Sequence, residues 1–292
     1  MHVVVKAYGK INIFLDCIGK REDGYHEVSM IMQSVRLHDL VEISEAETNS
    51  VFTDSMYVPN NRNNLAMRAA LLLQEQFDMP SVAIKIKKNI PVSAGMAGGS
   101  SDAAAVFVGC NALFDLGLSE KELMRLAANI GSDVPFCIKG GTAIAEGRGE
   151  KIRPLTDLPK MHVLLARADY GVSTAAVYKE IKPSDLHPQK ALFSQLCDAV
   201  HHGDTVFVEN HLYNALEEPS FRVDPRTKKR KQILLDGGVQ HVLMSGSGPT
   251  LFALYATEHD AWQNYKKIRA LFSNVYLTST CSSDLIKDRV IF

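Results

Sequence analysis

Hydrophobic and polar residues alternate along the start of the chain, which is the pattern of half-buried strands. Two strands are predicted over residues 3–5 and 11–18, on either side of the bend KAYGK. In the second strand, Lys10 and Asn12 share one face, and Ile11 and Ile13 lie on the other. Further strands are predicted over residues 26–37, 39–45 and 81–90.

Helical spacing of apolar residues follows these strands. It predicts helices over residues 63–77 and 102–116 and a third that starts at Ser119, and residues 136–150 predict a hairpin. Asn63 or Asn64 caps the first helix. Glu122 completes a capping box with Ser119, and Gly131 is expected to end that helix.

Pro154 and Pro159 bracket a predicted linker to the second half of the chain. Beyond it, we predict strands over residues 161–168 and 274–280, and a strand, glycine turn and strand over 237–256. Helices are predicted over 173–181 and 258–272, and residues 183–200 are predicted to be a proline-bounded loop followed by a helix. Because antiparallel runs of strands occur as well as strands beside helices, the pattern indicates an α+β fold.

The composition is that of a globular protein with a sizeable core. The chain has 292 residues, of which 46% are hydrophobic and 22% charged, and a net charge of −1. A nearly neutral chain has no overall field for nucleic acid or an anionic membrane, so we expect neither partner. Five widely spaced cysteines without a CxxC pair indicate neither a disulfide framework nor a zinc knuckle, and they fit a reducing, cytoplasmic location.

No segment predicts a membrane anchor or a leader. The first twenty residues lack the order of a signal peptide, and apolar runs are shorter than the ~18 residues of a membrane helix. The basic segment RTKKRK, residues 226–231, lacks interleaved aromatic residues and is interpreted as a solvated loop or helix start. The segment HHGD, residues 201–204, lacks a metal-binding context and is expected at a helix end.

The segment IPVSAGMAGGSSDAAAVF has the order strand, glycine-rich turn, helix start. Glycines permit positive φ and a close ligand, while a helix start offers free N–H groups to an anion. The turn is not a Walker A motif because the required lysine is absent. A tight packing turn is the alternative. The alanines after the loop are expected to keep the first helical turn thin.

This segment resembles the phosphate-binding loop of the GHMP small-molecule kinases. The resemblance implies that ATP phosphates are bound by the loop residues Pro91, Ala94, Gly95, Met96, Ala97, Gly98, Gly99, Ser100 and Ser101. Three other segments, KINIFLDCIGKREDGYHEV, IGSDVPFCIKGGTAIAEGRGE and LMSGSGPTLFAL, resemble one branch of the family.

The resemblance also implies a two-domain GHMP kinase fold with the active site in the cleft between the domains. Residues 1–153, with a C-terminal strand over 277–292, form the expected ATP-binding and catalytic domain, and residues 154–276 the substrate-binding domain. The implied reaction is ATP-dependent phosphorylation of a cytidine diphosphate conjugate of methylerythritol at its 2-hydroxyl, in non-mevalonate isoprenoid precursor biosynthesis. Mg²⁺ is expected to accompany ATP.

The resemblance assigns catalytic roles to Asp133, as the base, and to Lys10. Pro135 disfavours helix at Val134, so the carboxylate of Asp133 is expected on a rigid transition between elements; an aspartate that ends a helix is the alternative. Asn12 is expected to hydrogen-bond either the lysine or the acceptor.

Further residues are assigned to the two substrates by the resemblance. Cytidine recognition falls to Tyr25, His26 and Tyr178, and Thr174 is expected near the phosphates. Lys88 and Asn64 are expected on the ATP side, Gly246 and Ser247 behind the substrate, and Ser100 or Ser101 is a candidate Mg²⁺ ligand; the other metal ligands are unknown.

Two departures from the family pattern leave alternatives open. Tyr8 and Gly9 precede Lys10 where the family commonly has proline and alanine, and Met32 replaces an aromatic residue of some relatives. A sibling kinase for homoserine or mevalonate, or a weakly active nucleotide-binding paralogue, is the alternative reading. Monomer and dimer both remain open.

Overall fold

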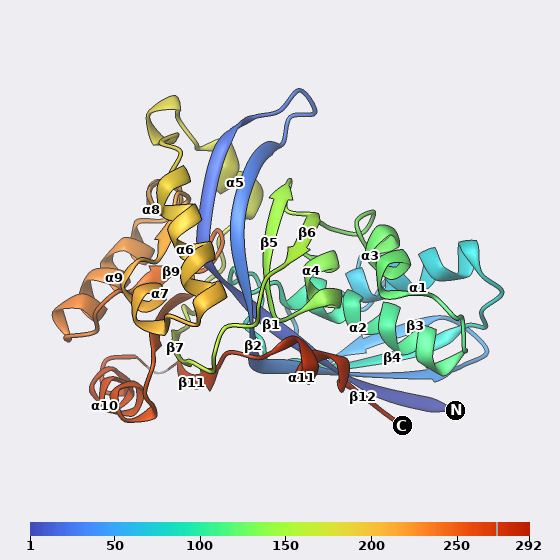
Figure 1. Ribbon diagram of the computed structural model, residues 1–292. Helices are drawn as coiled ribbons and strands as arrows, with labels where there is room; N and C mark the ends of the chain where they lie inside the picture. Colours follow the sequence, from blue (N-terminus) through green and yellow to red (C-terminus); the bar gives the residue numbers. More distant parts are fainter. Residues whose placement is uncertain (273) are drawn as a thin grey trace.

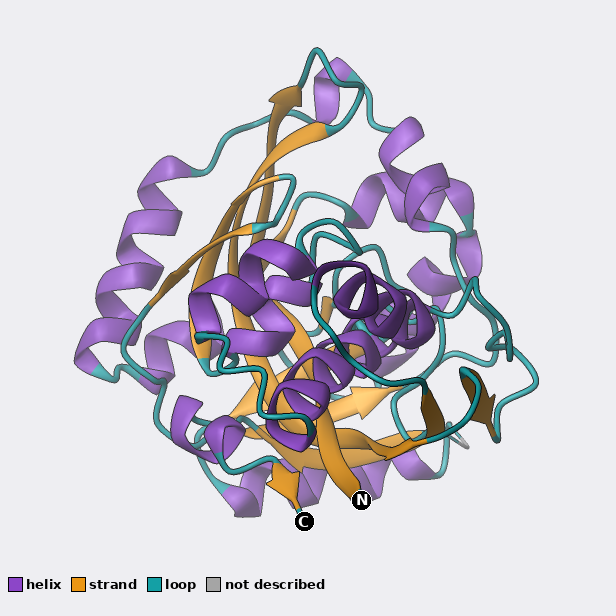
Figure 2. Ribbon diagram, turned by 90° about the vertical axis from the view of Figure 1, so that its right-hand side faces the viewer, coloured by secondary structure: helices purple, strands orange, loops and turns teal. Residues whose placement is uncertain are grey.

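The computed structural model describes residues 1–272 and 274–292. Long strands run through the middle of the molecule and helices surround them (Figures 1 and 2). The strands are β1 (His2–Lys20), β2 (His26–Glu45), β3 (Ser50–Thr53), β4 (Val82–Lys87), β5 (Thr142–Gly147), β6 (Lys151–Pro154), β7 (His162–Ala166), β8 (Tyr213–Asn214), β9 (Leu243–Met244), β10 (Leu251–Tyr255), β11 (Val275–Ser279) and β12 (Val290–Ile291).

The helices are mostly short. They are α1 (Leu65–Gln76), α2 (Gly98–Leu113), α3 (Glu120–Ala127), α4 (Val134–Lys139), α5 (Thr174–Lys179), the 3-10 helix η1 (Pro183–Asp185), α6 (Lys190–His202), α7 (Thr205–Asn210), α8 (Glu217–Val223), α9 (Pro225–Asp236), α10 (Glu258–Arg269) and α11 (Ser283–Lys287). Within the described residues, none of them is both long and apolar enough to cross a membrane.

Two sheets organise these elements. The larger has the order β12-β1-β2-β4-β3, and β5 and β8 pair with β2 and β1 respectively. The smaller has the order β11-β7-β10-β9 and is antiparallel throughout. The middle of the β1–β2 hairpin packs on the smaller sheet, since Ile11 and Ile13 share a buried cluster with Val163 and Phe252. The largely antiparallel sheets, packed with helices, confirm the α+β fold.

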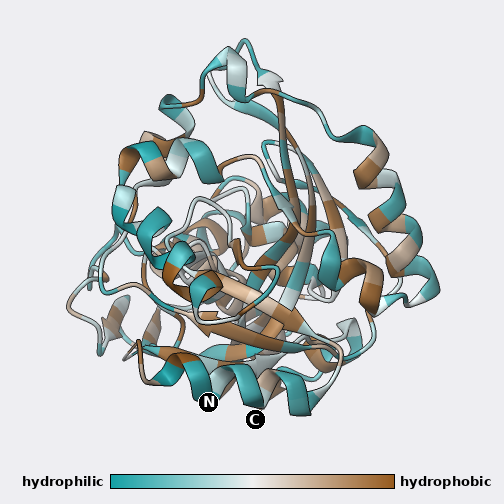
Figure 3. Cartoon of the chain, turned by 90° about the vertical axis from the view of Figure 1, so that its left-hand side faces the viewer, coloured by the Kyte–Doolittle hydropathy of each residue, from teal (hydrophilic) through white to brown (hydrophobic). Residues whose placement is uncertain are grey.

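The hydrophobic core follows the strands. Apolar residues concentrate on the central strands, while the outer helices carry hydrophilic residues on their exposed sides (Figure 3). Helix α2 lies against β1 and β2, and Gly109 makes this close approach possible, because a Cβ there would lie 2.5 Å from Ile43 Cδ1. The alanines of α2, Ala103 to Ala105, are buried in the same hydrophobic cluster as the strands. Their small side chains contribute to the packing of the helix. The expectation that they also leave room for a phosphate stays a prediction.

The first predicted strands are continuous in the structure. Residues 3–5 and 11–18 belong to the single strand β1, and the predicted strands over 26–37 and 39–45 are both part of β2. The register of the two strands shifts between Tyr8 and Lys10 and again between Asn12 and Phe14. A β-bulge reorients side chains without ending a strand. The bend predicted at KAYGK is thus wrong, and a bulge stands in its place.

The segment after α3 also differs from its prediction. Helix α3 has the predicted capping box but ends at Ala127, with Ala128 as its C-cap rather than Gly131. Val134 is helical, because Pro135 lies in the first turn of α4, where its missing N–H is tolerated. The predicted hairpin accordingly begins later, with β5 and β6.

The ends of the chain lie side by side, where β12 pairs antiparallel with β1 (Figure 1). Residues 277–292 are not one strand: β11 belongs to the smaller sheet, and α11 separates it from β12. The division into domains at residues 153 and 154 stays a prediction. The basic segment 226–231 is the start of α9, and residues 201–204 span the end of α6 and the cap of α7, as expected.

Candidate active site

A cavity of about 880 Å³ lies where the glycine-rich loop meets β1, α5 and the turn after β9. Its lining includes Gly95, Ala97 and Gly98 from the loop, together with Lys10 and Asp133. Segments from both halves of the sequence therefore face the same space.

The glycine-rich loop delivers free N–H groups to this cavity. The first intrahelical bond of α2 runs from Ser101 N to Ala97 O at 2.8 Å, so the N–H groups of Gly98, Gly99 and Ser100 precede the hydrogen-bonded ladder. Ala97 caps the helix in the left-handed region, with φ 58°, and Ser93 has φ 52°. Left-handed conformations of residues other than glycine store strain and gather at ligand sites.

A second glycine turn supports the loop from behind. Gly95 has φ 74°, and a Cβ on it would lie 1.9 Å from Ser245 O. The Ser245 hydroxyl donates to Gly95 O at 2.9 Å. Glycine is thus required at residue 95 both for its conformation and for space.

The predicted phosphate-binding residues divide into two groups. The cavity is lined by Ala94, Gly95, Ala97, Gly98, Gly99 and Ser100. Pro91, Met96 and Ser101 are buried and do not line it. The Ser101 hydroxyl donates to Tyr8 O at 2.7 Å and lies 3.0 Å from Ala97 O, so of the two candidate metal ligands Ser100 is the one at the cavity.

Lys10 and Asp133 form an ion pair at the surface of the cavity. Their Nζ and Oδ2 atoms are 3.8 Å apart, and the side chains are 5% and 32% exposed. Asp133 is the N-cap residue of α4 but makes no capping hydrogen bond through its side chain, so its carboxylate stays available. Asn12 Oδ1 accepts a hydrogen bond from Lys10 Nζ at 2.7 Å. Asn12 is fully buried outside the cavity lining and therefore orients the lysine.

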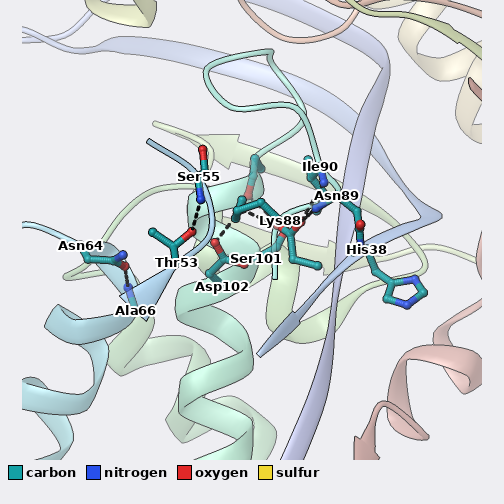
Figure 4. A network of polar contacts seen from close by, with 12 residues as sticks. His38, Thr53, Ser55, Asn64, Ala66, Lys88, Asn89, Ile90, Ser101 and Asp102 are labelled. Carbon is teal, nitrogen blue, oxygen red and sulfur yellow. Dashed lines mark hydrogen bonds and ion pairs between the residues drawn. The ribbon is translucent and has the colours of Figure 1, made fainter. Parts of the chain in front are cut away.

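Lys88 does not reach the cavity. Its ammonium group lies between the carboxylates of Asp39 and Asp102, and all three side chains are at least 94% buried (Figure 4). Burial raises the pKa of Asp102 to about 8, against the opposing effect of Lys88. Asp39 also accepts hydrogen bonds from the N–H groups of Asn89 and Ile90. We call Lys88, Asp39 and Asp102 the buried triad; it ties β2 to the strand end before the loop and to α2.

Asn64 is likewise outside the cavity lining. Its side chain accepts a hydrogen bond from Ala66 N at 2.9 Å, as predicted for the cap of α1, and donates to Pro59 O (Figure 4). The neighbouring Leu65 does line the cavity. Within this structure, Asn64 therefore acts on α1 and Leu65 faces the site.

Another part of the cavity surface is formed by Tyr25, His26, Arg148 and Tyr178, which we call the acceptor wall. The rings of His26 and Tyr178 are 5.4 Å apart, and the Arg148 guanidinium lies 4.9 Å from the ring centre of Tyr25. Burial and the charge of Lys20 lower the pKa of His26, so the imidazole is neutral at neutral pH. A neutral imidazole offers one donor and one acceptor to a ligand.

The turn after β9 completes the cavity next to α5. Gly246 and Ser247 line the cavity, and the Ser247 hydroxyl lies 2.8 Å from that of Thr174. A Cβ on Gly246 would lie 3.3 Å from Lys10 Nζ, which places this turn against the catalytic candidate. Residues 246 and 247 thus lie at the cavity surface rather than behind it.

Sequence reasoning missed several charged residues of the cavity, namely Lys20, Arg148 and Lys179. Arg148 stands between two glycines in GRG, at the tip of the β5–β6 hairpin. The glycines on either side of Arg148 were the available sequence signal that this charged residue lies on a turn. Met32 is fully buried in the core, so its departure from the family pattern does not alter the cavity surface.

Comparison with known families gives two matches along the chain. Residues 64–141 match the model described as "GHMP kinases N terminal domain", and residues 198–274 match "GHMP kinases C terminal". The first match contains the loop, the buried Asp102 and Asp133.

Curated proteins resemble the chain over nearly its full length. A 4-diphosphocytidyl-2-C-methyl-D-erythritol kinase of Caldicellulosiruptor saccharolyticus is 39% identical over 289 residues, 98% of this chain and 99% of its own. A protein of the same name from Bacillus cytotoxicus is 44% identical over 280 residues, 94% of this chain and 96% of its own.

Solved structures share the fold. The crystal structure of a 4-(cytidine 5'-diphospho)-2C-methyl-D-erythritol kinase matches with a TM-score of 0.78 and 31% identity, covering 95% of this chain and 98% of its own. A homoserine kinase from Cytophaga hutchinsonii matches with a TM-score of 0.76 at 18% identity, covering 97% of this chain and 96% of its own, which shows the common fold alone.

Proposed function

The chain belongs to the GHMP kinase family, and from this membership we propose that it transfers the γ-phosphoryl group of ATP to the 2-hydroxyl of 4-diphosphocytidyl-2-C-methyl-D-erythritol. One observation carries the proposal. A single cavity holds the N–H groups of the α2 start, the Lys10–Asp133 pair and the acceptor wall. These are the three parts that a kinase for a base-linked alcohol requires.

The loop is suited to the triphosphate. Unpaired N–H groups and the positive end of the α2 dipole favour negative charge at Gly98, Gly99 and Ser100. The second glycine turn holds Gly95 in place, so these donors are oriented before ATP binds. Preorganised donors stabilise charge in the transition state without reorganisation.

Asp133 and Lys10 are suited to the transfer itself. The Asp133 carboxylate accepts the proton of the acceptor hydroxyl as its oxygen forms a bond to the γ-phosphorus. The bond from that phosphorus to the β–γ bridging oxygen breaks, and ADP leaves. The Lys10 ammonium, 3.8 Å from the carboxylate, stabilises negative charge on the transferring group.

The residues of the cavity fit a Mg²⁺ ion that arrives with ATP. Within the described residues, His, Cys, Asp and Glu side chains do not form a group of three that could hold a metal. Mg²⁺ commonly binds through one or two protein oxygens together with substrate phosphates. Among the cavity-lining residues, the Ser100 hydroxyl and the Asp133 carboxylate would hold the ion, which would neutralise phosphate charge there.

The acceptor wall suits a cytidine diphosphate. Tyr25 and Tyr178 offer aromatic faces for stacking, the neutral His26 offers a donor and an acceptor to the cytosine edge, and Arg148 offers positive charge. A kinase for homoserine or mevalonate would have no use for this set.

A turnover assay tests the acceptor. Purified protein is given ATP, Mg²⁺ and each of three acceptors: the cytidine diphosphate conjugate of methylerythritol, homoserine and mevalonate. We expect phosphorylation of the first alone, with competitive inhibition by free cytidine phosphates. Turnover of homoserine or mevalonate would identify a sibling kinase instead, and ATP binding without any turnover would identify a paralogue that only binds nucleotide.

The base is tested by Asp133→Asn, which keeps shape and removes the charge. Loss of a general base lowers kcat by about 10²–10⁴-fold. Affinity for a non-hydrolysable ATP analogue should be retained, because the loop is untouched. The control Asp284→Asn changes an exposed carboxylate of α11 and should leave kcat unchanged. Full turnover by Asp133→Asn would remove Asp133 from the mechanism.

A further inference from the structure

Arg289, near the C-terminus, connects the two elements that carry Lys10 and Asp133, namely β1 and α4. The roles of Lys10 and Asp133 rest on the proposed function. Arg289 lies just before β12 and is 6% exposed. Its main-chain carbonyl accepts a hydrogen bond from Lys6 N on β1, four residues before Lys10. Its guanidinium donates to Cys137 O at 2.7 Å and Ile138 O at 2.6 Å, in the last turn of α4. Asp133 stands at the other end of that helix.

Helix α4 is short enough to move as one body. Its six residues span about 9 Å, so a displacement of the last turn is carried to the first. The last turn leaves carbonyls without intrahelical partners, and a cation there is favoured by the helix dipole. The Arg289 guanidinium provides both the hydrogen-bond donors and the positive charge at this helix end. Its planar group binds two carbonyl oxygens at once.

The segment that carries Arg289 is itself anchored. Ile286 of α11 is buried against the turn after α4, where a Cβ on Gly140 would lie 2.5 Å from its side chain. Ser283 donates to the Asp157 carboxylate through both its N–H and its hydroxyl. Tyr8 packs with Ile286 and Cys281, so the aromatic residue at the family departure contacts this segment.

A second contact links α4 to the phosphate loop. The Cys137 thiol lies 3.4 Å from the Ser101 hydroxyl, which donates to Tyr8 O and lies near Ala97 O. Burial raises the pKa of Cys137 to about 12, so the thiol keeps its proton. The last turn of α4 therefore touches the base of the loop as well as the C-terminal segment.

We propose that Arg289 is a positioning residue for phosphoryl transfer: it fixes α4 relative to β1 and so sets the distance between the Asp133 carboxylate and the Lys10 ammonium. Its side chain is buried against main-chain carbonyls and does not touch the cavity. Burial lowers the pKa of Arg289 to about 10, which leaves the guanidinium charged at neutral pH. The C-terminal segment thereby fixes the position of Asp133 relative to Lys10.

The test compares wild type, Arg289→Ala, Arg289→Lys and Lys287→Ala, all at a temperature at which each is folded by circular dichroism. Lys287 is an exposed residue of the same segment and serves as the matched control. We expect kcat of Arg289→Ala to fall about tenfold or more, since a shift of about 1 Å can lower a rate about a hundredfold. KM for both substrates and affinity for an ATP analogue should stay within about twofold, because a displaced base does not alter the binding groups. Arg289→Lys keeps the charge but has a single donor nitrogen in place of the planar fork, and it should recover part of kcat.

A purely structural role predicts another outcome. Loss of kcat in proportion to the folded fraction, or equal losses in kcat and nucleotide affinity, would overturn the proposal, as would wild-type kcat in both Arg289 variants. If Arg289→Ala does not fold, Arg289→Lys decides: reduced kcat with unchanged KM supports positioning, and unchanged kcat contradicts it. Wild-type turnover tests the proposed function separately. Crystal structures of wild type and variant report the Lys10–Asp133 distance whichever acceptor is correct, with an increase expected in the variant.

Discussion

The phosphate loop and the acceptor wall face the same cavity and are held by different means. The loop depends on main-chain conformation, with left-handed residues at Ala97 and Gly95, and on the buried triad beside it. The acceptor wall depends on side chains, and Tyr25 is 55% exposed, with Arg148 over its ring. A change in the loop therefore acts on folding and nucleotide binding together, whereas a change in the wall acts on one substrate.

The largest expected effect on stability is at the buried triad. Lys88→Met removes the cation beside the buried Asp39 carboxylate and the hydrogen-bond donor to Asp102, and breaking such a buried pair lowers the free energy of unfolding by about 3–5 kcal/mol. The control Lys85→Met removes an exposed partner of Glu42, where we expect about 1 kcal/mol or less. Urea denaturation measures both; equal losses would contradict a special role for the triad.

Gly95 sharpens the comparison within the loop. Gly95→Ala and the control Gly117→Ala both place alanine in the left-handed region, at φ 74° and 66°, and share a strain of about 1–2 kcal/mol. The two sites differ in the space around the new Cβ. At Gly95 it would clash with Ser245 O, whereas at Gly117 no atom lies within 4 Å. Nucleotide affinity, measured by calorimetry, should fall at least about tenfold for Gly95→Ala. An affinity like that of Gly117→Ala would show that the loop tolerates displacement.

The acceptor wall should respond differently. Tyr25→Ala removes a stacking surface, for which losses of about 1–3 kcal/mol per base are typical, so KM for the cytidine conjugate should rise about five- to a hundredfold. KM for ATP and the free energy of unfolding should stay close to wild type. Tyr57→Ala, at another exposed tyrosine, is the control and should change neither KM. If Tyr25→Ala weakens ATP as much as the acceptor, the two sides are not independent.

The smallest effect is a pH dependence that belongs to the triad. Burial raises the pKa of Asp102 from 3.8 to about 8, so the folded state binds this proton more tightly than the unfolded chain. The resulting stability is fully present below about pH 4 and is lost as the pH rises through 8. Asp102→Asn removes this dependence. Between pH 6 and 7, the wild type should lose up to about 1.4 kcal/mol of stability relative to Asp102→Asn. If the free energies of unfolding of wild type and Asp102→Asn, measured by urea denaturation, depend on pH in the same way, the raised pKa of Asp102 is contradicted.

Local signals in the sequence predicted much of the structure. Asn64 as the α1 cap, the Ser119 capping box and the glycine-rich turn into α2 depend on residues within one turn of each other, and all three are present. The α4 start was missed because proline ends some helices and begins others, and the difference lies in the packing around Val134.

Contacts between distant residues could not be predicted in this way. Lys88 is a polar residue at the end of a strand, and its turn toward Asp39 depends on a partner 49 positions away. Arg289 contacts Cys137 across 152 positions, and the sequence around it carries no motif. Arg148 reaches Tyr25 only because β5 pairs with β2. Side-chain roles in this site therefore follow from the sheet register, which spacing alone does not specify.

The central claim is that one cavity aligns the triphosphate on the loop with an alcohol at Asp133. A crystal structure with a non-hydrolysable ATP analogue, Mg²⁺ and the cytidine conjugate tests it most directly. We predict phosphate oxygens on the N–H groups of Gly98, Gly99 and Ser100, and the 2-hydroxyl within hydrogen-bond distance of the Asp133 carboxylate. Phosphates bound away from the start of α2, or a 2-hydroxyl that points away from Asp133, would contradict the account.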